Sequence, residues 1–383
     1  MIKFSFLLLT YNRRDLVRHA IASILKQDYE QFELIVIDNG SQPPINDIVH
    51  AFNDQRATYY RHDKNIHGCD ALEFALTYTT GTHLLFIADD DVLVPGALKR
   101  VADFFTSHPE AEFLQGGFVD FNHIDRTSKT SLSKLNSFDG RVESFDGEEN
   151  AIYYCNGWGI GEKKPYRATP MAHASTAFIS TGLLRRVKHK QGAVFIKPFG
   201  DIGYVGCSAN TNKIYYLNFP LAVIGETLVR EMVGSQRGKR HKWDQEIEHL
   251  MYSPLKGPSF VNMGMDAHLK IMHANGLHDK FDTRLRPDFF VRHLSQVISD
   301  SPWDARTFHD IGEVMPHYAK SLFQFISLNA LVVKLVLYPL SLLKRIIRRI
   351  RKYTKNHTKP DRTNTYSNIN EFARWVHIST TNH

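Results

Sequence analysis

The sequence predicts an α/β fold built on a Rossmann-like sheet, and three features of its first part predict it. Apolar runs of strand length alternate with amphipathic stretches, and polar residues follow the runs. A strand, a helix and a second strand within residues 3–38 form a βαβ unit, which requires parallel pairing. We therefore expect helices to flank the sheet and ligands to bind at the carboxyl ends of its strands.

The predicted elements follow one another as far as residue 105. Buried strands are expected at 3–10, 33–38, 58–61 and 83–88. Helices are expected at 15–25, 45–53, 71–80 and 95–105. Further strands are expected at 113–121 and 175–179, whereas residues 123–170 have the composition of loops.

The positive charge of the chain is concentrated in one segment. The formal net charge is +7, but residues 344–362 hold nine Lys or Arg and one Asp, so the remainder is close to neutral. A nucleic-acid-binding protein would spread basic residues over a folded face, so we expect no nucleic-acid partner. Residues 321–356 run from apolar to basic, which is typical of a helix lying on an anionic membrane surface. A core helix followed by a basic tail is the alternative.

Cysteine and histidine usage predicts neither a disulfide framework nor a zinc site. The three cysteines show no CxxC spacing, and the twenty histidines include no HExxH motif. Sparse cysteines favour a reducing cytosol. The apolar run near the N-terminus is interpreted as a buried strand and not as a signal peptide, because no small-residue cleavage site follows it.

Asp89, Asp90 and Asp91 are the strongest chemical signal in the sequence, because they directly follow a predicted buried strand. Adjacent carboxylates repel one another, so a bound cation would favour the arrangement. Mg²⁺ and Mn²⁺ prefer oxygen ligands and are commonly shared between carboxylates and a substrate diphosphate. A solvated acidic turn is the structural alternative.

Weaker candidates lie elsewhere along the chain. Asp38 ends a predicted strand and could bind a base or ribose, or could simply organise a turn. The segment from Asn65 to Gly68 precedes a helix, where backbone N–H groups suit a diphosphate. Asp201 lies among glycines and aromatic residues and could act as a general base, while His173 could contact phosphate or acceptor. The alternatives are a loop acid and a packed histidine.

Arg237 belongs to a third kind of candidate, a basic loop near Gly234 and Gly238. Such a loop could close over a diphosphate and neutralise the leaving group. A solvated loop explains the same residues.

Taken together, these motifs resemble family 2 glycosyltransferases of the GT-A fold. The resemblance covers about the first 105 residues and depends on the order and spacing of four segments. They are FSFLLLTYNR at 4–13, ELIVIDNGS at 33–41, NIHG at 65–68 and GTHLLFIADDDVLVPGAL at 81–98. It implies a mixed sheet flanked by helices, followed by a helical C-terminal extension.

The resemblance also implies roles for individual residues. The nucleotide-sugar pocket would be lined by Thr10, Tyr11, Asn12, Asp38, Asn65, Gly68, Asp89 and Asp90. The acidic triplet would be the DxD-type motif, with Asp89 and Asp91 holding Mg²⁺ or Mn²⁺ on the diphosphate. Asp201 would be the catalytic base, although Gly200 stands where the family often has Glu.

The implied activity is that of an inverting, hexosyl-type glycosyltransferase that acts on a nucleotide-diphosphate sugar, with UDP-sugars favoured. We find no QxxRW motif and no set of membrane spans, so single addition is expected instead of polymer synthesis. The acceptor would be a glycan or a lipid-linked glycan of a cell-envelope polysaccharide pathway. The enzyme would be cytoplasmic and peripheral on the inner face of the membrane.

The resemblance divides the chain into five segments. They are a nucleotide-sugar-binding half, an acceptor-binding and catalytic-base half, a helical extension, a membrane-association segment and a loosely ordered polar tail, at residues 1–105, 106–235, 236–320, 321–356 and 357–383. Two other functions remain open. A sugar-nucleotide-forming nucleotidyltransferase would carry a Gly-rich loop after its first strand, and a non-catalytic carbohydrate-binding protein would need no base.

Overall fold

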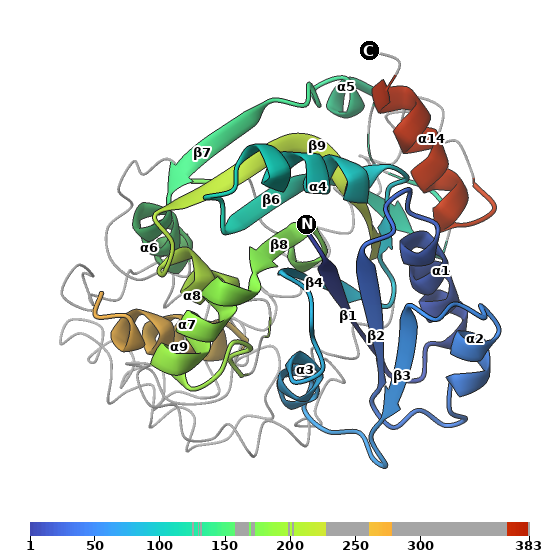
Figure 1. The fold of residues 1–383 in the computed structure, drawn as a ribbon, viewed down its shortest axis with the longest axis horizontal. Helices are drawn as coiled ribbons and strands as arrows, with labels where there is room; N and C mark the ends of the chain where they lie inside the picture. Colours follow the sequence, from blue (N-terminus) through green and yellow to red (C-terminus); the bar gives the residue numbers. More distant parts are fainter. Residues whose placement is uncertain are drawn as a thin grey trace, which may run out of the picture.

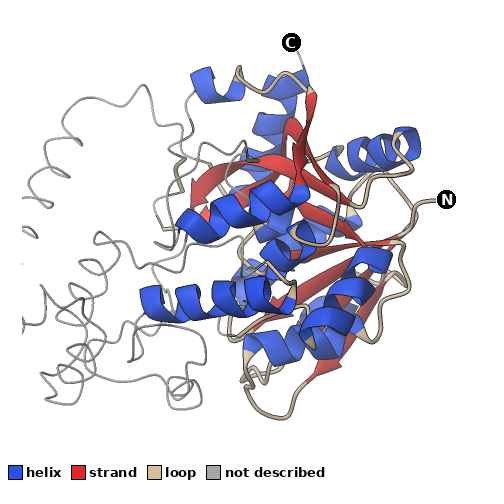
Figure 2. Cartoon of the chain, turned by 90° about the vertical axis from the view of Figure 1, so that its left-hand side faces the viewer, coloured by secondary structure: helices blue, strands red, loops and turns tan. Residues whose placement is uncertain are grey.

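The computed structural model shows one mixed β-sheet with helices on both faces (Figures 1 and 2). The sheet has nine strands in the order β3-β2-β1-β4-β8-β6-β9-β5, with β7 paired to β9. The described residues are 1–124, 126–128, 130, 132–157, 168–169, 173–197, 200, 203–226, 260–277 and 366–381.

The first four long strands form the parallel half of the sheet, as the sequence predicts. Their bounds are β1 Phe4–Thr10, β2 Phe32–Asp38, β3 Ala57–Arg61 and β4 His83–Ala88. The connecting helices are α1 Arg14–Leu25, α2 Asn46–His50 and α3 Gly68–Leu76. In register, Thr10 lies beside Asp38, and Leu9 lies beside Ala88. The carboxyl ends of β1, β2 and β4 therefore meet at one edge.

The second half of the sheet is mainly antiparallel and comes from distant parts of the chain. Its strands are β5 Val92–Leu93, β6 Phe113–Asn122, β7 Val142–Asp146, β8 Ala177–Ser180 and β9 Lys213–Glu226. Strand β8 runs antiparallel to β4 and β6, whereas β6 and β9 are parallel. The fourteen residues of β9 pair with β6 along most of its length and end beside the strand-end edge.

Apolar side chains alternate between the two faces of the sheet and bury two separate clusters. Phe4, Phe6 and Leu8 of β1 face α1, α4 (Ala97–Ser107) and α14 (Ile369–Thr381). Leu7 of β1 faces α3, α7 (Thr181–Gln191) and α8 (Gly203–Ser208). This alternation is the period of two that a strand buried on both faces requires.

A third, smaller cluster holds α6 (Gly147–Gly157) and α9 (Phe260–Ala274) against α8. The short elements α5 (Leu132–Leu135) and η1 (Ala174–Thr176) complete the described part of the chain. Residues 123–170, expected to be loops, thus contain α5, β7 and the whole of α6. None of the described helices is both long and apolar enough to cross a membrane. The predicted membrane-association segment, 321–356, lies outside the described residues.

The C-terminal helix corrects one expectation. Residues 357–383 were expected to form a loosely ordered polar tail, but α14 packs against α1, β5 and β9 (Figure 1). Ile369, Phe372, Ala373 and Val376 are buried in the same cluster as β1. They lie at positions i, i+3, i+4 and i+7, which places them on one helical face. This short apolar stripe, and not the average composition, determines the structure here.

Candidate active site

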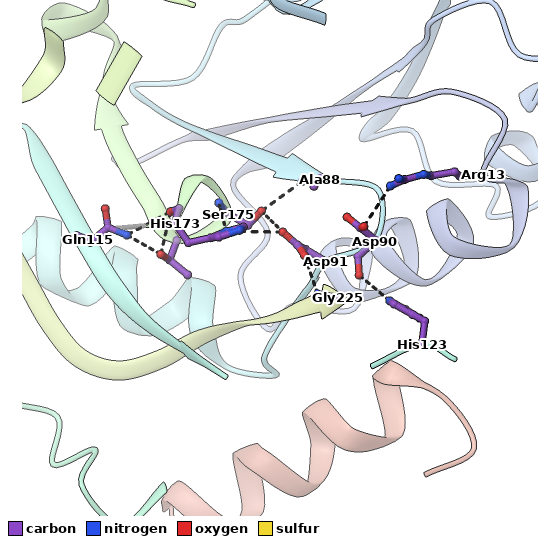
Figure 3. A network of polar contacts seen from close by, with 10 residues as sticks. Arg13, Ala88, Asp90, Asp91, Gln115, His123, His173, Ser175 and Gly225 are labelled. Carbon is purple, nitrogen blue, oxygen red and sulfur yellow. Dashed lines mark hydrogen bonds and ion pairs between the residues drawn. The ribbon is translucent and has the colours of Figure 1, made fainter. Parts of the chain in front are cut away.

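Asp89, Asp90 and Asp91 lie in the turn that follows β4, at the strand-end edge of the parallel half. Figure 3 shows Asp90 and Asp91 with their partners. Asp89 is 5% exposed and Asp91 is 1% exposed. Buried carboxylates of this kind require hydrogen bonds or a cation, because desolvation destabilises their charged form. The surroundings of each carboxylate therefore show what holds the triplet together.

Asp89 is held by residues from the end of β1. Thr10 Oγ1 donates to its Oδ2 at 2.7 Å, and Arg13 Nη1 lies 3.0 Å from its Oδ1. The same Arg13 nitrogen lies 3.1 Å from Asp90 Oδ2, so one guanidinium bridges two acids. Burial raises the pKa of Asp89 to about 6, and Asp90 adds to the rise, while Arg13 and Thr10 oppose it.

Asp91 is held by residues from the second half of the chain. Ser175 Oγ donates to Asp91 Oδ2 at 2.5 Å, and the backbone N–H of Gly225 donates to Oδ1 at 2.9 Å. His173 Nδ1 lies 3.8 Å from Asp91 Oδ2. Burial raises the pKa of Asp91 well above its usual range, and the neighbouring Asp90 charge raises it further.

His173 is positioned by the short helix η1. Its Nδ1 accepts from the N–H of Ser175 at 3.3 Å, which caps the helix, and Gln115 Nε2 donates to its carbonyl oxygen at 3.2 Å. Gln115 also donates to Thr176 at 2.6 Å, so β6 fixes the turn from behind. Burial lowers the pKa of His173 to about 4, so the ring is neutral at pH 7. With Nδ1 accepting, the ring proton is on Nε2, which makes that atom a donor.

Asp38 forms the centre of the neighbouring loop. Its Oδ1 accepts from the N–H of Ser41 at 2.7 Å, and its Oδ2 accepts from Tyr59 Oη at 2.8 Å and from the N–H of Ile45 at 3.2 Å. Arg61 Nε lies 3.6 Å from the same oxygen. Asp38 is fully buried. The carboxylate therefore organises the turn, which was one of the two predicted roles; contact with a nucleotide stays a prediction.

Asn12 joins this loop to the end of β1. It adopts a left-handed backbone (φ 55°), a conformation that asparagine tolerates better than most residues. Its N–H donates to Ser41 Oγ at 3.0 Å, and its Oδ1 accepts from the N–H of Gln42 at 2.8 Å. The adjacent Tyr11 is 38% exposed. Asn12 thus has a structural role, and Tyr11 presents an accessible ring at the same edge.

The segment before α3 is tied to the same loop through Asn39. Asn39 Nδ2 donates to Asn65 Oδ1 at 2.9 Å and to the carbonyl of Ile66 at 2.8 Å. Gly40 permits this approach, because an added Cβ would lie 2.6 Å from Asn65 N. Gly68 is the first residue of α3, and His67 caps the helix by accepting from Cys69 N at 3.2 Å. The predicted anion-binding segment is thus a helix N-terminus at this edge.

The described structure brings most predicted site residues to one edge of the sheet, but it does not describe two of them. Asp201 and Arg237 lie outside the described residues, so their roles stay predictions. Sequence reasoning missed Arg13, Ser175, Gly225 and His123, all shown in Figure 3. Arg13 and Ser175 adjoin segments that were singled out, so their proximity was the available signal. Gly225 and His123 had no comparable signal.

A divalent cation fits the chemistry of this site. Within the described residues, no three His, Cys, Asp or Glu side chains are gathered as a complete metal cage. Such a cage is unnecessary for Mg²⁺, which usually takes one or two carboxylates and completes its shell with water and substrate phosphate. Burial, and then the neighbouring Asp90, raise the pKa values of Asp89 and Asp91 and so disfavour their charged forms. A hard cation would favour those charged forms.

The mixed sheet flanked by helices, with carboxylates after the fourth strand of its parallel half, has the GT-A fold that the sequence predicts. Residues 5–168 match the family described as Glycosyl transferase family 2. The solved structure of TarS 1–349 from S. aureus, in complex with UDP-GlcNAc, shares the fold. The TM-score is 0.50 at 16% identity, covering 84% of each chain.

Curated relatives match the N-terminal region. CgeD of Bacillus subtilis is 29% identical over 119 residues, which covers 29% of this chain and 28% of the relative. The putative colanic acid biosynthesis glycosyl transferase WcaA of Escherichia coli is 36% identical over 92 residues, which covers 24% and 33%. A PGL/p-HBAD biosynthesis glycosyltransferase of Mycobacterium bovis is 31% identical over 121 residues, which covers 30% and 46%. The matched region therefore spans less than half of each of these relatives.

Proposed function

We propose that the protein is an inverting glycosyltransferase that moves a sugar from a nucleoside-diphosphate donor to a hydroxyl of a glycan or lipid-linked acceptor. The observation that carries the proposal is the acidic triplet at the end of β4, with Asp89 and Asp91 buried, within a region that matches glycosyl transferase family 2. A nucleotidyltransferase is disfavoured, because the loop after β1 is Thr10-Tyr11-Asn12-Arg13 and contains no glycine.

The donor is a nucleotide-diphosphate sugar, with UDP-sugars favoured and a hexosyl group transferred. Asp89 and Asp91 would hold Mg²⁺ or Mn²⁺, which supplies positive charge for the departing diphosphate. Thr10 and Arg13 orient Asp89, and Ser175 and Gly225 orient Asp91, so the carboxylates are held before the donor arrives. Tyr11 and the N-terminus of α3 would contact the nucleotide and its phosphates.

The transfer itself is a single displacement. Asp201 accepts the proton of the acceptor hydroxyl, whose oxygen bonds to the anomeric carbon as the bond from that carbon to the diphosphate oxygen breaks. The nucleoside diphosphate leaves with the bonding electron pair, and Arg237 would neutralise part of its charge. His173, a neutral Nε2 donor beside Asp91, would hydrogen-bond a phosphate or acceptor oxygen.

The acceptor side of the proposal depends on the sequence of 321–356, whose amphipathic and basic character suits an anionic membrane. We place the enzyme on the inner face of the cytoplasmic membrane, in the assembly of a cell-envelope polysaccharide. Removing 321–356 should release the protein from anionic vesicles while the acidic triplet keeps its function.

The direct test is release of nucleoside diphosphate from UDP-, GDP-, dTDP- and CDP-sugars, with Mn²⁺ or with EDTA. We expect metal-dependent release from one donor and its loss in Asp201→Asn, with unchanged nucleotide binding. If no donor is turned over and none binds, the carbohydrate-binding alternative replaces this proposal.

A further inference from the structure

His123 connects the end of β6 to the backbone of the acidic triplet. Its Nε2 lies 2.9 Å from the carbonyl oxygen of Asp90, which can only accept, so His123 is the donor (Figure 3). Its own N–H donates to the carbonyl of Glu226 at 3.0 Å, at the end of β9. His123 therefore connects the ends of β6 and β9, through its backbone, to the turn that carries Asp89 and Asp91, through its ring.

The contact occurs at a position where the backbone is tightly packed. A Cβ added to Gly225 would lie 2.0 Å from the Asp90 carbonyl oxygen and 2.5 Å from His123 Nε2. The Gly225 N–H meanwhile donates to Asp91 Oδ1. The Asp90 peptide is thus enclosed by His123 and Gly225, and its orientation determines where the flanking carboxylates point.

The C-terminal helix α14 supports His123 from behind. Phe372 of α14 stacks on Phe121 with ring centroids 5.6 Å apart, and Phe121 meets the His123 ring edge-on at 5.4 Å. Phe121 and Phe372 are both 1% exposed. The N–H of Tyr366, just before α14, donates to the carbonyl of Arg126 at 3.1 Å, which fixes the loop that follows His123.

We propose that His123 is a positioning residue for the acidic triplet and that α14 holds it in place. The C-terminal helix is then part of the donor site, although it lies almost three hundred positions after Asp91. This inference rests on the proposed function, because the carboxylates that His123 positions are the ones proposed to bind the metal. Loss of such a supporting hydrogen bond typically costs about 10- to 100-fold in activity or metal affinity.

The first test compares His123→Leu with His123→Gln, because the glutamine amide can still donate to the Asp90 carbonyl. We expect the leucine variant either to have a kcat lower by about 10- to 100-fold or to need about 10- to 100-fold more Mn²⁺ for its half-maximal rate. Glutamine should recover most of that loss, whereas the KM for the acceptor should not change in either variant. Equal kinetics in wild type and His123→Leu would overturn the proposal.

The second test asks whether α14 acts through His123 or only through stability. Phe372→Leu and Val376→Ala both change buried side chains of α14, but only Phe372 stacks on Phe121. Below the Tm of each variant, we expect Phe372→Leu to shift the Mn²⁺ dependence and Val376→Ala to leave it unchanged. The same shift in both variants would show that α14 has no specific part in the site.

A readout without turnover separates this proposal from the proposed function. Amide hydrogen exchange across residues 88–93 should be faster in His123→Leu than in wild type, and unchanged in Val376→Ala. Faster exchange in a protein that turns over no nucleotide sugar would retain the positioning role and refute the proposed function. Unchanged exchange in an active enzyme would refute the positioning role and retain the proposed function.

Discussion

The two halves of the sheet contribute differently to the candidate site. The parallel half supplies the acids, because β4 ends directly in Asp89, Asp90 and Asp91. The mixed half supplies their surroundings: Ser175 reaches Asp91 across 84 positions of sequence, and Gly225 reaches it across 134. A local segment can thus supply the reactive carboxylates, whereas their protonation and orientation depend on residues that are distant in the sequence. Changing single residues in one half or the other therefore separates the two contributions.

Arg13→Met should have the largest effect, and it lies wholly within the parallel half. It removes the guanidinium that bridges Asp89 and Asp90, whose side chains keep only 7% and 15% exposure. Removing one partner of a buried ion pair costs about 3–5 kcal/mol, because the remaining charge is uncompensated. Urea unfolding at pH 7 measures this loss. Lys99→Met, in an exposed pair with Asp103, should change the unfolding free energy far less; equal losses would contradict the account.

Asp91→Asn tests the acid that the mixed half holds. We expect the rate of nucleoside-diphosphate release to fall by about 10²- to 10³-fold, equivalent to about 3–4 kcal/mol, because stabilisation of the leaving charge is lost. Stability should change little or rise, since a buried carboxylate with a raised pKa is replaced by a neutral amide. Asp103→Asn on the exposed face of α4 is the matched control. Full activity in Asp91→Asn would remove the triplet from the mechanism.

His83 tests the parallel half at the opposite end of β4 from the acids. Burial lowers the pKa of His83 to about 4, and its ring lies 3.9 Å from that of Phe105. As the pH falls below 6.5, His83 takes up a proton in the unfolded chain but not in the folded protein. The full free energy of unfolding is therefore present above pH 6.5 and decreases as the pH falls towards 4. The shift corresponds to about 3 kcal/mol at 1.36 kcal/mol per pKa unit.

His83→Gln should therefore flatten the dependence of the unfolding free energy on pH between 6.5 and 4. His173 and His268 also have pKa values lowered to about 4, so His83→Gln will keep part of the wild-type slope. The comparison is between slopes, measured by urea unfolding across that range. Identical slopes would show that His83 titrates normally in the folded state.

Gly225→Ala tests how closely β9 approaches the triplet, and its main expected effect is smaller than those of the three changes above. The added methyl group would meet the Asp90 carbonyl at 2.0 Å, so the backbone must shift, at a cost of about 2 kcal/mol. The shift also weakens the N–H bond to Asp91, so activity should fall with stability. Gly182→Ala, in α7, would place its Cβ 3.9 Å from Ser180 Oγ, an ordinary contact, and should be neutral or stabilising by up to about 1 kcal/mol. Normal activity in Gly225→Ala would contradict the role given to β9.

Local patterns were sufficient to predict the parallel half. The apolar runs before Thr10, Asp38 and Asp89 have strand length, and parallel pairing places their ends together, so the candidate site could be located from sequence. The partners of Asp91 could not be predicted, because the residues around Ser175 and Gly225 carry no signal for the part of the sheet that they contact. The docking of α14 does not follow from average composition, because the apolar stripe from Ile369 to Val376 is short and lies within a polar segment.

The most direct test of the account is nucleotide binding, measured by thermal shift with UDP, GDP, dTDP and CDP, each with Mn²⁺ or with EDTA, on wild type and Asp91→Ala. A ligand at a hundred times its dissociation constant adds about 2.7 kcal/mol to stability, which is easily observed. The account predicts a shift with one nucleotide that requires Mn²⁺ in the wild type and is absent in Asp91→Ala. A nucleotide shift of equal size in EDTA, or in Asp91→Ala, would contradict the claim that the strand-end acids form a metal-dependent donor site.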